Sequence, residues 1–103
     1  SMTPEQRQLA RHALGLDGRR KVSYRNRFAA TCNSCDYEQW MDMVKAGIAG
    51  GRHDAGSTMT HFWLTEAGAL AALLPGERLD QEDFPSVKTY TNTNYRPRRT
   101  ATA

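Results

Sequence analysis

Apolar side chains recur at helical spacing near the start of the chain. Thr3 is a favoured N-cap, Pro4 suits the first helical position, and Gly15 is typical of a helix end. The segment between them is predicted to be an amphipathic helix. Two of its cations, Arg7 and Arg11, are four residues apart and are expected on the outer face.

A second helix is predicted from its ends and from its apolar face. Asp36 is a favoured N-cap, and Gly47 supplies the left-handed residue that commonly follows a helix. Glu38 and Asp42 fall on the polar face of this helix. The apolar face comprises Tyr37, Trp40, Met41 and Val44.

A strand is predicted between these two helices because apolar and polar residues alternate there. Residues 21–29 place Val22, Tyr24 and Phe28 on one side and Lys21, Ser23, Arg25 and Arg27 on the other. A short helix over residues 23–29 is the alternative interpretation. The alternation favours the strand.

A glycine-rich hairpin and a third helix follow without a gap. Residues 48–53 and 59–64 form the predicted arms of the hairpin, and residues 54–58 form its tip. Thr65 is the expected cap of the last helix, and Pro75 ends it.

The predicted order of elements is helix, strand, helix, strand, strand, helix, which indicates an α+β fold. We assign residues 2–85 to one domain and residues 86–103 to a polar, basic tail. Residues 87–95 could add as an edge strand, either within the chain or to a second copy in a homodimer. The interior of the domain is expected to include Trp40, Val44, Leu64 and Leu70.

The segment from residue 44 to residue 73 resembles the wing region of winged-helix regulators of the multiple-antibiotic-resistance type. In that family a recognition helix ends in glycine, a basic wing follows, and the last wing strand runs into the motif LTEAG. The matching pieces here are VKAGI at 44–48, Arg52 with His53, and FWLTEAG at 62–68. The resemblance implies a winged-helix-like fold and suggests a DNA-binding regulator. The chain also resembles small phage and prophage proteins of unassigned function, through residues 24–28, 36–37 and 43–47.

Cations are concentrated towards the two ends of the chain, which carries a net charge of +3. Residues 1–30 hold seven Arg or Lys against two acids, and the last 18 residues hold four cations and no acid. Such asymmetry is typical of a protein with a polyanionic partner. The residues expected to contact a nucleic-acid backbone are Arg19, Arg20, Lys21, Arg25, Arg27 and Arg52.

The second helix is poorly suited to reading the major groove. It carries Asp36, Glu38 and Asp42 against Lys45, and acids near phosphate cause repulsion instead of releasing counterions. Nucleic-acid binding would therefore rely on backbone contacts. The alternative function is docking on another protein through Glu38, Asp42 and Trp63.

Neighbouring aromatic residues in the second hairpin arm cannot share one interior. Phe62 and Trp63 point to opposite faces of a strand. One of them must therefore be covered by another element or by a partner.

Catalytic and metal-binding signals are weak in this sequence. Cys32 and Cys35 form one CxxC motif, and a zinc site would need two histidines from elsewhere. We therefore interpret both cysteines as reduced thiols and expect no metal or cofactor. No paired carboxylates or nucleophile motif indicates an enzyme, so we expect a non-enzymatic binding or regulatory protein.

Length and composition fit one small domain with a limited core. The chain has 103 residues, of which 39% are hydrophobic, and its mean hydropathy is −0.71. No apolar run approaches the roughly 18–20 residues of a membrane span. Two cysteines are too few for a disulfide framework, so we expect a cytoplasmic protein without a membrane partner.

Overall fold

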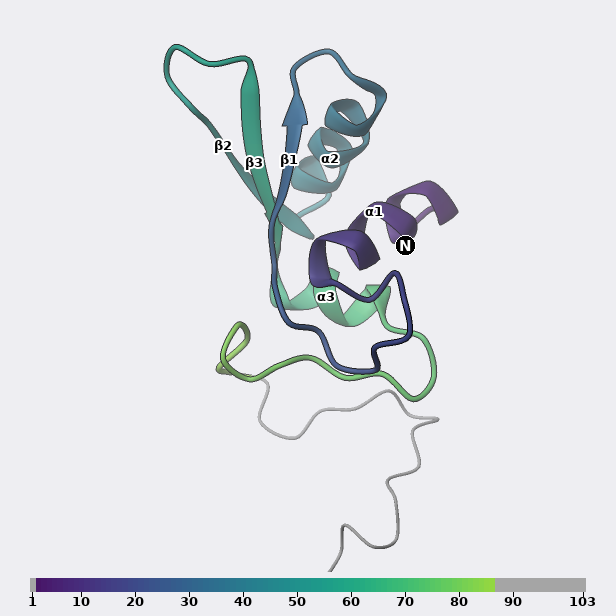
Figure 1. Ribbon diagram of the computed structural model, residues 1–103. Coiled ribbons are helices and arrows are strands. Elements are labelled where there is room, and N and C mark those ends of the chain that lie inside the picture. Colours follow the sequence, from purple (N-terminus) through teal and green to yellow (C-terminus); the bar gives the residue numbers. More distant parts are fainter. Residues whose placement is uncertain (1, 87–103) are drawn as a thin grey trace, which may run out of the picture.

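The computed structural model describes residues 2–86 and shows three helices and one three-stranded sheet. The predicted α+β order and its winged-helix-like topology are confirmed. The sheet is antiparallel, with strand order β1-β3-β2 (Figure 1). In chain order the elements are α1 (Pro4–Leu14), β1 (Phe28–Thr31), α2 (Cys35–Lys45), β2 (Ala49–His53), β3 (Met59–Leu64) and α3 (Glu66–Ala72).

Capping residues fix both ends of α1 and the start of α3 as the sequence predicted, whereas α3 ends at Ala72, before the predicted stop at Pro75. Thr3 and Gln6 form a reciprocal capping box, in which each side chain accepts a hydrogen bond from the other residue's backbone N–H. Gly15 ends α1 in the left-handed region, with φ of 80°. Thr65 caps α3 by accepting a hydrogen bond from the N–H of Gly68.

The second helix begins earlier than predicted. Ser34, not Asp36, is the N-cap of α2, since its hydroxyl accepts a hydrogen bond from the N–H of Tyr37 at 3.1 Å. Asp36 lies in the first turn instead, where its carboxylate still favours the positive end of the helix dipole. Serine and aspartate are comparable caps, so the sequence could not choose between them.

The predicted strand over residues 21–29 is wrong for most of its length, and so is the alternative helix. β1 begins only at Phe28, and the expected alternation is reversed at two positions, since Ser23 is buried and Tyr24 is 47% exposed. The backbone N–H groups of Tyr24 and Arg27 bond to carbonyls at the C-terminal end of α1. The backbone of Tyr24 and Arg27 is therefore attached to a helix end, and within this segment the side chain of Asn26 bonds to Leu64 of β3.

The helices cover one face of the sheet (Figure 1). The hydrophobic core lies between the helices and this face. Trp40 of α2 is fully buried and stacks on Phe62 with ring centroids 5.4 Å apart. Of the other residues predicted for the interior, Leu64 is buried, while Val44 and Leu70 pack on the rim of the same cluster. The predicted shared interior is thus confirmed, with two members at its edge.

The predicted tail at 86–103, including the edge strand at 87–95, lies outside the described residues except for Ser86. No helix within residues 2–86 is both long enough and apolar enough to cross a membrane.

Candidate nucleic-acid interface

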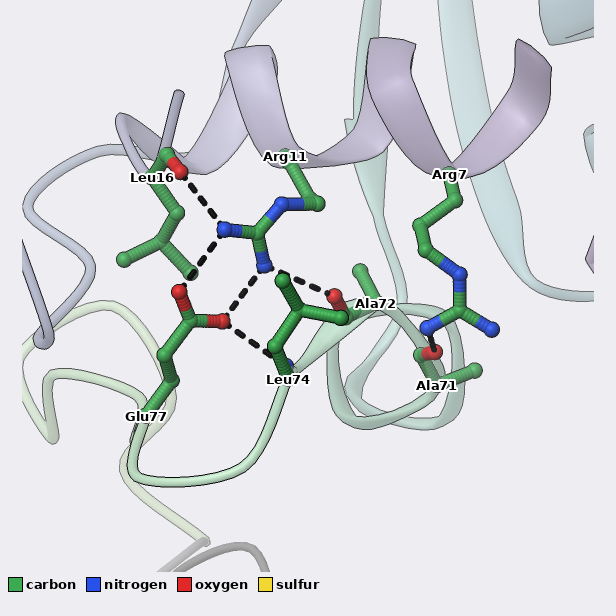
Figure 2. A network of polar contacts seen from close by, with 7 residues as sticks. All are labelled: Arg7, Arg11, Leu16, Ala71, Ala72, Leu74 and Glu77. Atoms are coloured by element: carbon green, nitrogen blue, oxygen red, sulfur yellow. Dashed lines mark hydrogen bonds and ion pairs between the residues drawn. The ribbon is translucent and has the colours of Figure 1, made fainter. Parts of the chain in front are cut away.

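Two of the N-terminal cations, which were predicted on an outer helix face, form hydrogen bonds to α3. Arg7 donates a hydrogen bond to the carbonyl of Ala71 at 2.9 Å, and Arg11 donates one to that of Ala72 at 3.1 Å (Figure 2). Both carbonyls belong to the last turn of α3, where a cation complements the helix dipole. The prediction of an outer arginine face on α1 is wrong because this face packs on α3.

Arg11 also forms an ion pair with Glu77, a carboxylate that is only 3% exposed (Figure 2). The guanidinium Nη2 donates to Glu77 Oε2 at 2.7 Å and to the carbonyl of Leu16 at 2.8 Å. Burial alone would raise the pKa of Glu77. The hydrogen bonds from Arg11 and from the N–H of Leu74, with the nearby positive charges, outweigh it and lower the pKa.

The remaining cations of this segment are available at the surface around an exposed tyrosine. Arg19, Arg20 and Lys21 are exposed in the loop after α1. The guanidinium of Arg20 lies 4.3 Å from the centroid of the Tyr24 ring, and that of Arg25 lies 5.1 Å from it. Cation–π contacts of this kind hold both charges close to one aromatic side chain.

Gly15 and His12 hold this cluster against α1. A Cβ atom at Gly15 would lie 2.1 Å from Tyr24 Cε1, so the ring lies directly on the glycine. Arg25 donates through Nη2 to the carbonyl of His12 at 2.7 Å. The exposed tyrosine is therefore fixed in place by the end of α1, with its cations beside it.

Arg25 and Arg27 join this cluster to the sheet. Both line a hollow of about 430 Å³ together with Ala29 of β1 and His61 of β3. They also line a second hollow of about 370 Å³ with Tyr24. The cationic segment thus continues onto the sheet face that carries His61.

Trp63 lies on the sheet face opposite to the helices, and its indole is 40% exposed. It packs over its cross-strand neighbour Gly50, where an added Cβ would lie 2.5 Å from the indole nitrogen. Phe62 takes the buried position instead, which answers the question that the sequence left open. We call this the open face; it comprises Ala29, Thr31, Gly50, Arg52, Met59, His61 and Trp63.

Arg52 and His61 are directly opposite each other on this open face. Arg52 is exposed, and His61 Nε2 lies 2.8 Å from a carboxylate oxygen of Asp54 at the hairpin tip. A second acid near these cations, Asp83, lines the hollow beside Tyr24. Burial and the neighbouring charge of Asp80 raise the pKa of Asp83.

The proposed protein-docking residues are not brought together by the fold. Glu38 and Asp42 are exposed on α2, whose other side carries Trp40 into the core. Trp63 lies across the sheet from that helix. A flat partner surface could therefore contact the acidic side of α2 or Trp63, but not both.

Cys32 and Cys35 are free thiols without a common ligand. Cys32 Sγ lies 3.7 Å from His53 Nδ1, and Cys35 is exposed at the first position of α2. Within residues 2–86 no three His, Cys, Asp or Glu side chains come close enough to hold a metal ion.

Sequence reasoning missed His61 and Tyr24 as members of the exposed surface. The alternation in β3 already placed His61 beside Trp63, so that signal was present. Tyr24 carried no such signal, because its environment depends on the end of α1. Comparison of the chain with protein-family models, with curated proteins and with solved structures finds no match.

Proposed function

We propose that this protein binds nucleic acid through the phosphate backbone, as a small non-enzymatic, intracellular binding or regulatory protein of phage type. The contact residues would be Arg19, Arg20, Lys21, Arg25, Arg27 and Arg52. None of these six cations forms an ion pair within the described residues, and the acids of α2 lie on the other side of the sheet.

The observation that carries the proposal is the position of Arg20 and Arg25 on the exposed Tyr24 ring. The two guanidinium groups are held at the surface, so a phosphate does not have to order both flexible side chains. Arginine forks match phosphate geometry and bind it in a bidentate manner. Because α2 is acidic, contacts to phosphate and not to base edges in the major groove would supply the affinity.

The test is the salt dependence of binding to a mixed-sequence duplex. Arg27→Gln and Arg52→Gln should each weaken binding and lower the slope of log K against log salt by about 0.9. Lys45→Gln is the matched control, because it removes one positive charge from the helix side of the molecule.

Equal effects of all three variants would contradict the assignment of this surface. If the unaltered protein does not bind the duplex even at low salt, the proposed nucleic-acid-binding function is contradicted.

Protein docking remains a second candidate because of the outer side of α2. Glu38 and Asp42 are exposed and four residues apart, and no ion pair within the described part of the chain involves either carboxylate. A basic protein partner would bind the unaltered chain and would be lost with Glu38→Lys and Asp42→Lys. Nucleic-acid binding would persist in the same double variant.

A further inference from the structure

We infer that the open face of the sheet binds single-stranded nucleic acid, with a base stacked on the indole of Trp63. This inference rests on the proposed function and specifies its ligand. This sheet face is separate from the acidic helix α2, and the resemblance to winged-helix regulators does not point to it as a binding surface.

Trp63 has the geometry of a stacking platform. The side chain is 40% exposed although it is one of the two largest aromatic residues of the domain, and it lies over Gly50 without a competing side chain beneath it. Phe62 and Trp40 already fill the interior on the other side of the sheet. Trp63 is therefore not needed for the core, and its outer surface is available for a planar ligand.

Small neighbours keep the platform accessible. Gly50 is the cross-strand partner of Trp63, and Ala29 is that of His61. His61 adds a second exposed ring two residues from Trp63, held by Asp54 at 2.8 Å. Two rings on one flat face suit successive unpaired bases, because every base has a planar surface that can stack.

Cations flank this platform on two sides. Arg52 lies on β2 opposite His61, and Arg27 lines the hollow that also contains His61. The register that pairs Phe28 with Phe62 places Arg27 level with Trp63. The Asn26 amide keeps this alignment beyond the end of β1, since it bonds to both the N–H and the carbonyl of Leu64.

This charge pattern selects a polyanion as the occupant of the open face. Two described acids lie near these arginines: Asp54 bonds to His61 at the hairpin tip, and Asp83 lines the hollow that Arg27 shares with Tyr24. A duplex keeps its bases stacked inside and cannot offer them to Trp63. A single strand can place a base on the indole while its phosphates reach Arg27 and Arg52.

The experiment compares labelled oligonucleotides of about 12 nucleotides, within the usual site size of one small domain. Single-stranded oligo-dT, oligo-U and mixed-sequence DNA are titrated into the full chain at low salt, beside the mixed-sequence duplex. Single strands should bind at least about five-fold more tightly than the duplex and should quench tryptophan emission. The DNA and RNA arms show whether the strand's sugar matters.

Trp63→Ala should weaken single-strand binding roughly 5- to 100-fold and leave duplex binding unchanged. Trp63→Phe, which keeps an aromatic ring, should retain part of the affinity and abolish most of the quenching. Leu74→Ala is the matched control, since Leu74 is another exposed large apolar residue, 43% exposed, at the end of α3. Circular dichroism confirms that each variant folds.

Equal binding of single strand and duplex, both insensitive to Trp63→Ala, would overturn this inference and leave the proposed function intact. Absence of binding to every oligonucleotide would overturn both. Self-association that is lost in Trp63→Ala, without oligonucleotide binding, would assign the open face to a second copy and also overturn the inference.

Discussion

Arginine residues in this chain serve two separate purposes. Arg7 and Arg11 bind the carbonyl groups that end α3, and Arg11 also neutralises the buried Glu77. Arg20 and Arg25 instead lie on an exposed aromatic ring. The number of cations in the N-terminal segment therefore overstates the charge that is available to a partner.

At the residue scale we predict that Glu77→Gln destabilises the fold by roughly 3 kcal/mol, because Arg11 would lose its buried counter-ion. Chemical denaturation at neutral pH measures this change. Glu82→Gln is the matched control, since Glu82 is exposed and its substitution should change stability by less than about 0.5 kcal/mol. Similar losses in both variants would contradict a special role of the Arg11–Glu77 pair.

The same pair predicts a pH dependence of stability. Since the pKa of Glu77 is lowered in the folded chain, the unfolded chain binds a proton more readily. The contribution of Glu77 is therefore present at neutral pH and is lost as the pH falls below about 4.3 towards the lower folded pKa. Denaturation between pH 7 and pH 3 should show a smaller decline in stability for Glu77→Gln than for the unaltered chain.

At the scale of elements, close packing between α3 and the chain before β2 explains one glycine of the TEAG motif. Gly68 is buried in α3, and a Cβ atom there would lie 1.9 Å from the carbonyl oxygen of Ile48. The same carbonyl accepts the hydrogen bond of the Thr65 N–H. The start of α3 is therefore fixed against the residue that leads into β2.

We predict that Gly68→Ala destabilises the fold by roughly 1–3 kcal/mol, since the methyl group has no space. Without this close contact, alanine would stabilise the helix relative to glycine by up to about 1 kcal/mol. The sign of the change in stability therefore distinguishes close packing from helix propensity. Gly18→Ala is the control, because no heavy atom lies within 4 Å of a Cβ there. A stabilising effect of Gly68→Ala in thermal unfolding would contradict the packing.

At the scale of the whole molecule, the sheet separates two surfaces of opposite charge. Glu38 and Asp42 are exposed on the helix side, while Arg52 and Arg27 flank the open face. The net charge of +3 is an average over both surfaces. The affinity for a polyanionic ligand should therefore depend more on where a charged residue lies than on the net charge of the chain.

Two substitutions of equal charge test this separation. Asp83→Asn removes an acid from the hollow beside Tyr24, and Asp42→Asn removes one from α2. Asp83→Asn should tighten oligonucleotide binding roughly two- to five-fold at low salt, whereas Asp42→Asn should change it little. An equal gain in both variants would show that net charge governs binding.

Local sequence signals determined the order of elements and most of their ends. Caps such as Thr3 and Thr65 and the alternation in residues 59–64 act within a few residues, so they can be read without a fold. The strand predicted over residues 21–29 is wrong for most of its length because the N–H groups of Tyr24 and Arg27 bond to carbonyls at the end of α1, outside the segment itself. Periodicity carries no information about such contacts.

Only the tertiary structure decided which side chains form surfaces. The sequence established that Phe62 and Trp63 face opposite ways, but the position of α2 made Phe62 the buried one. The sequence also contains seven cations in residues 1–30, and two of them, Arg7 and Arg11, are engaged by α3 and Glu77. Exposure depends on what lies across the sheet or the helix, and that neighbour is set by chain folding over long sequence distances.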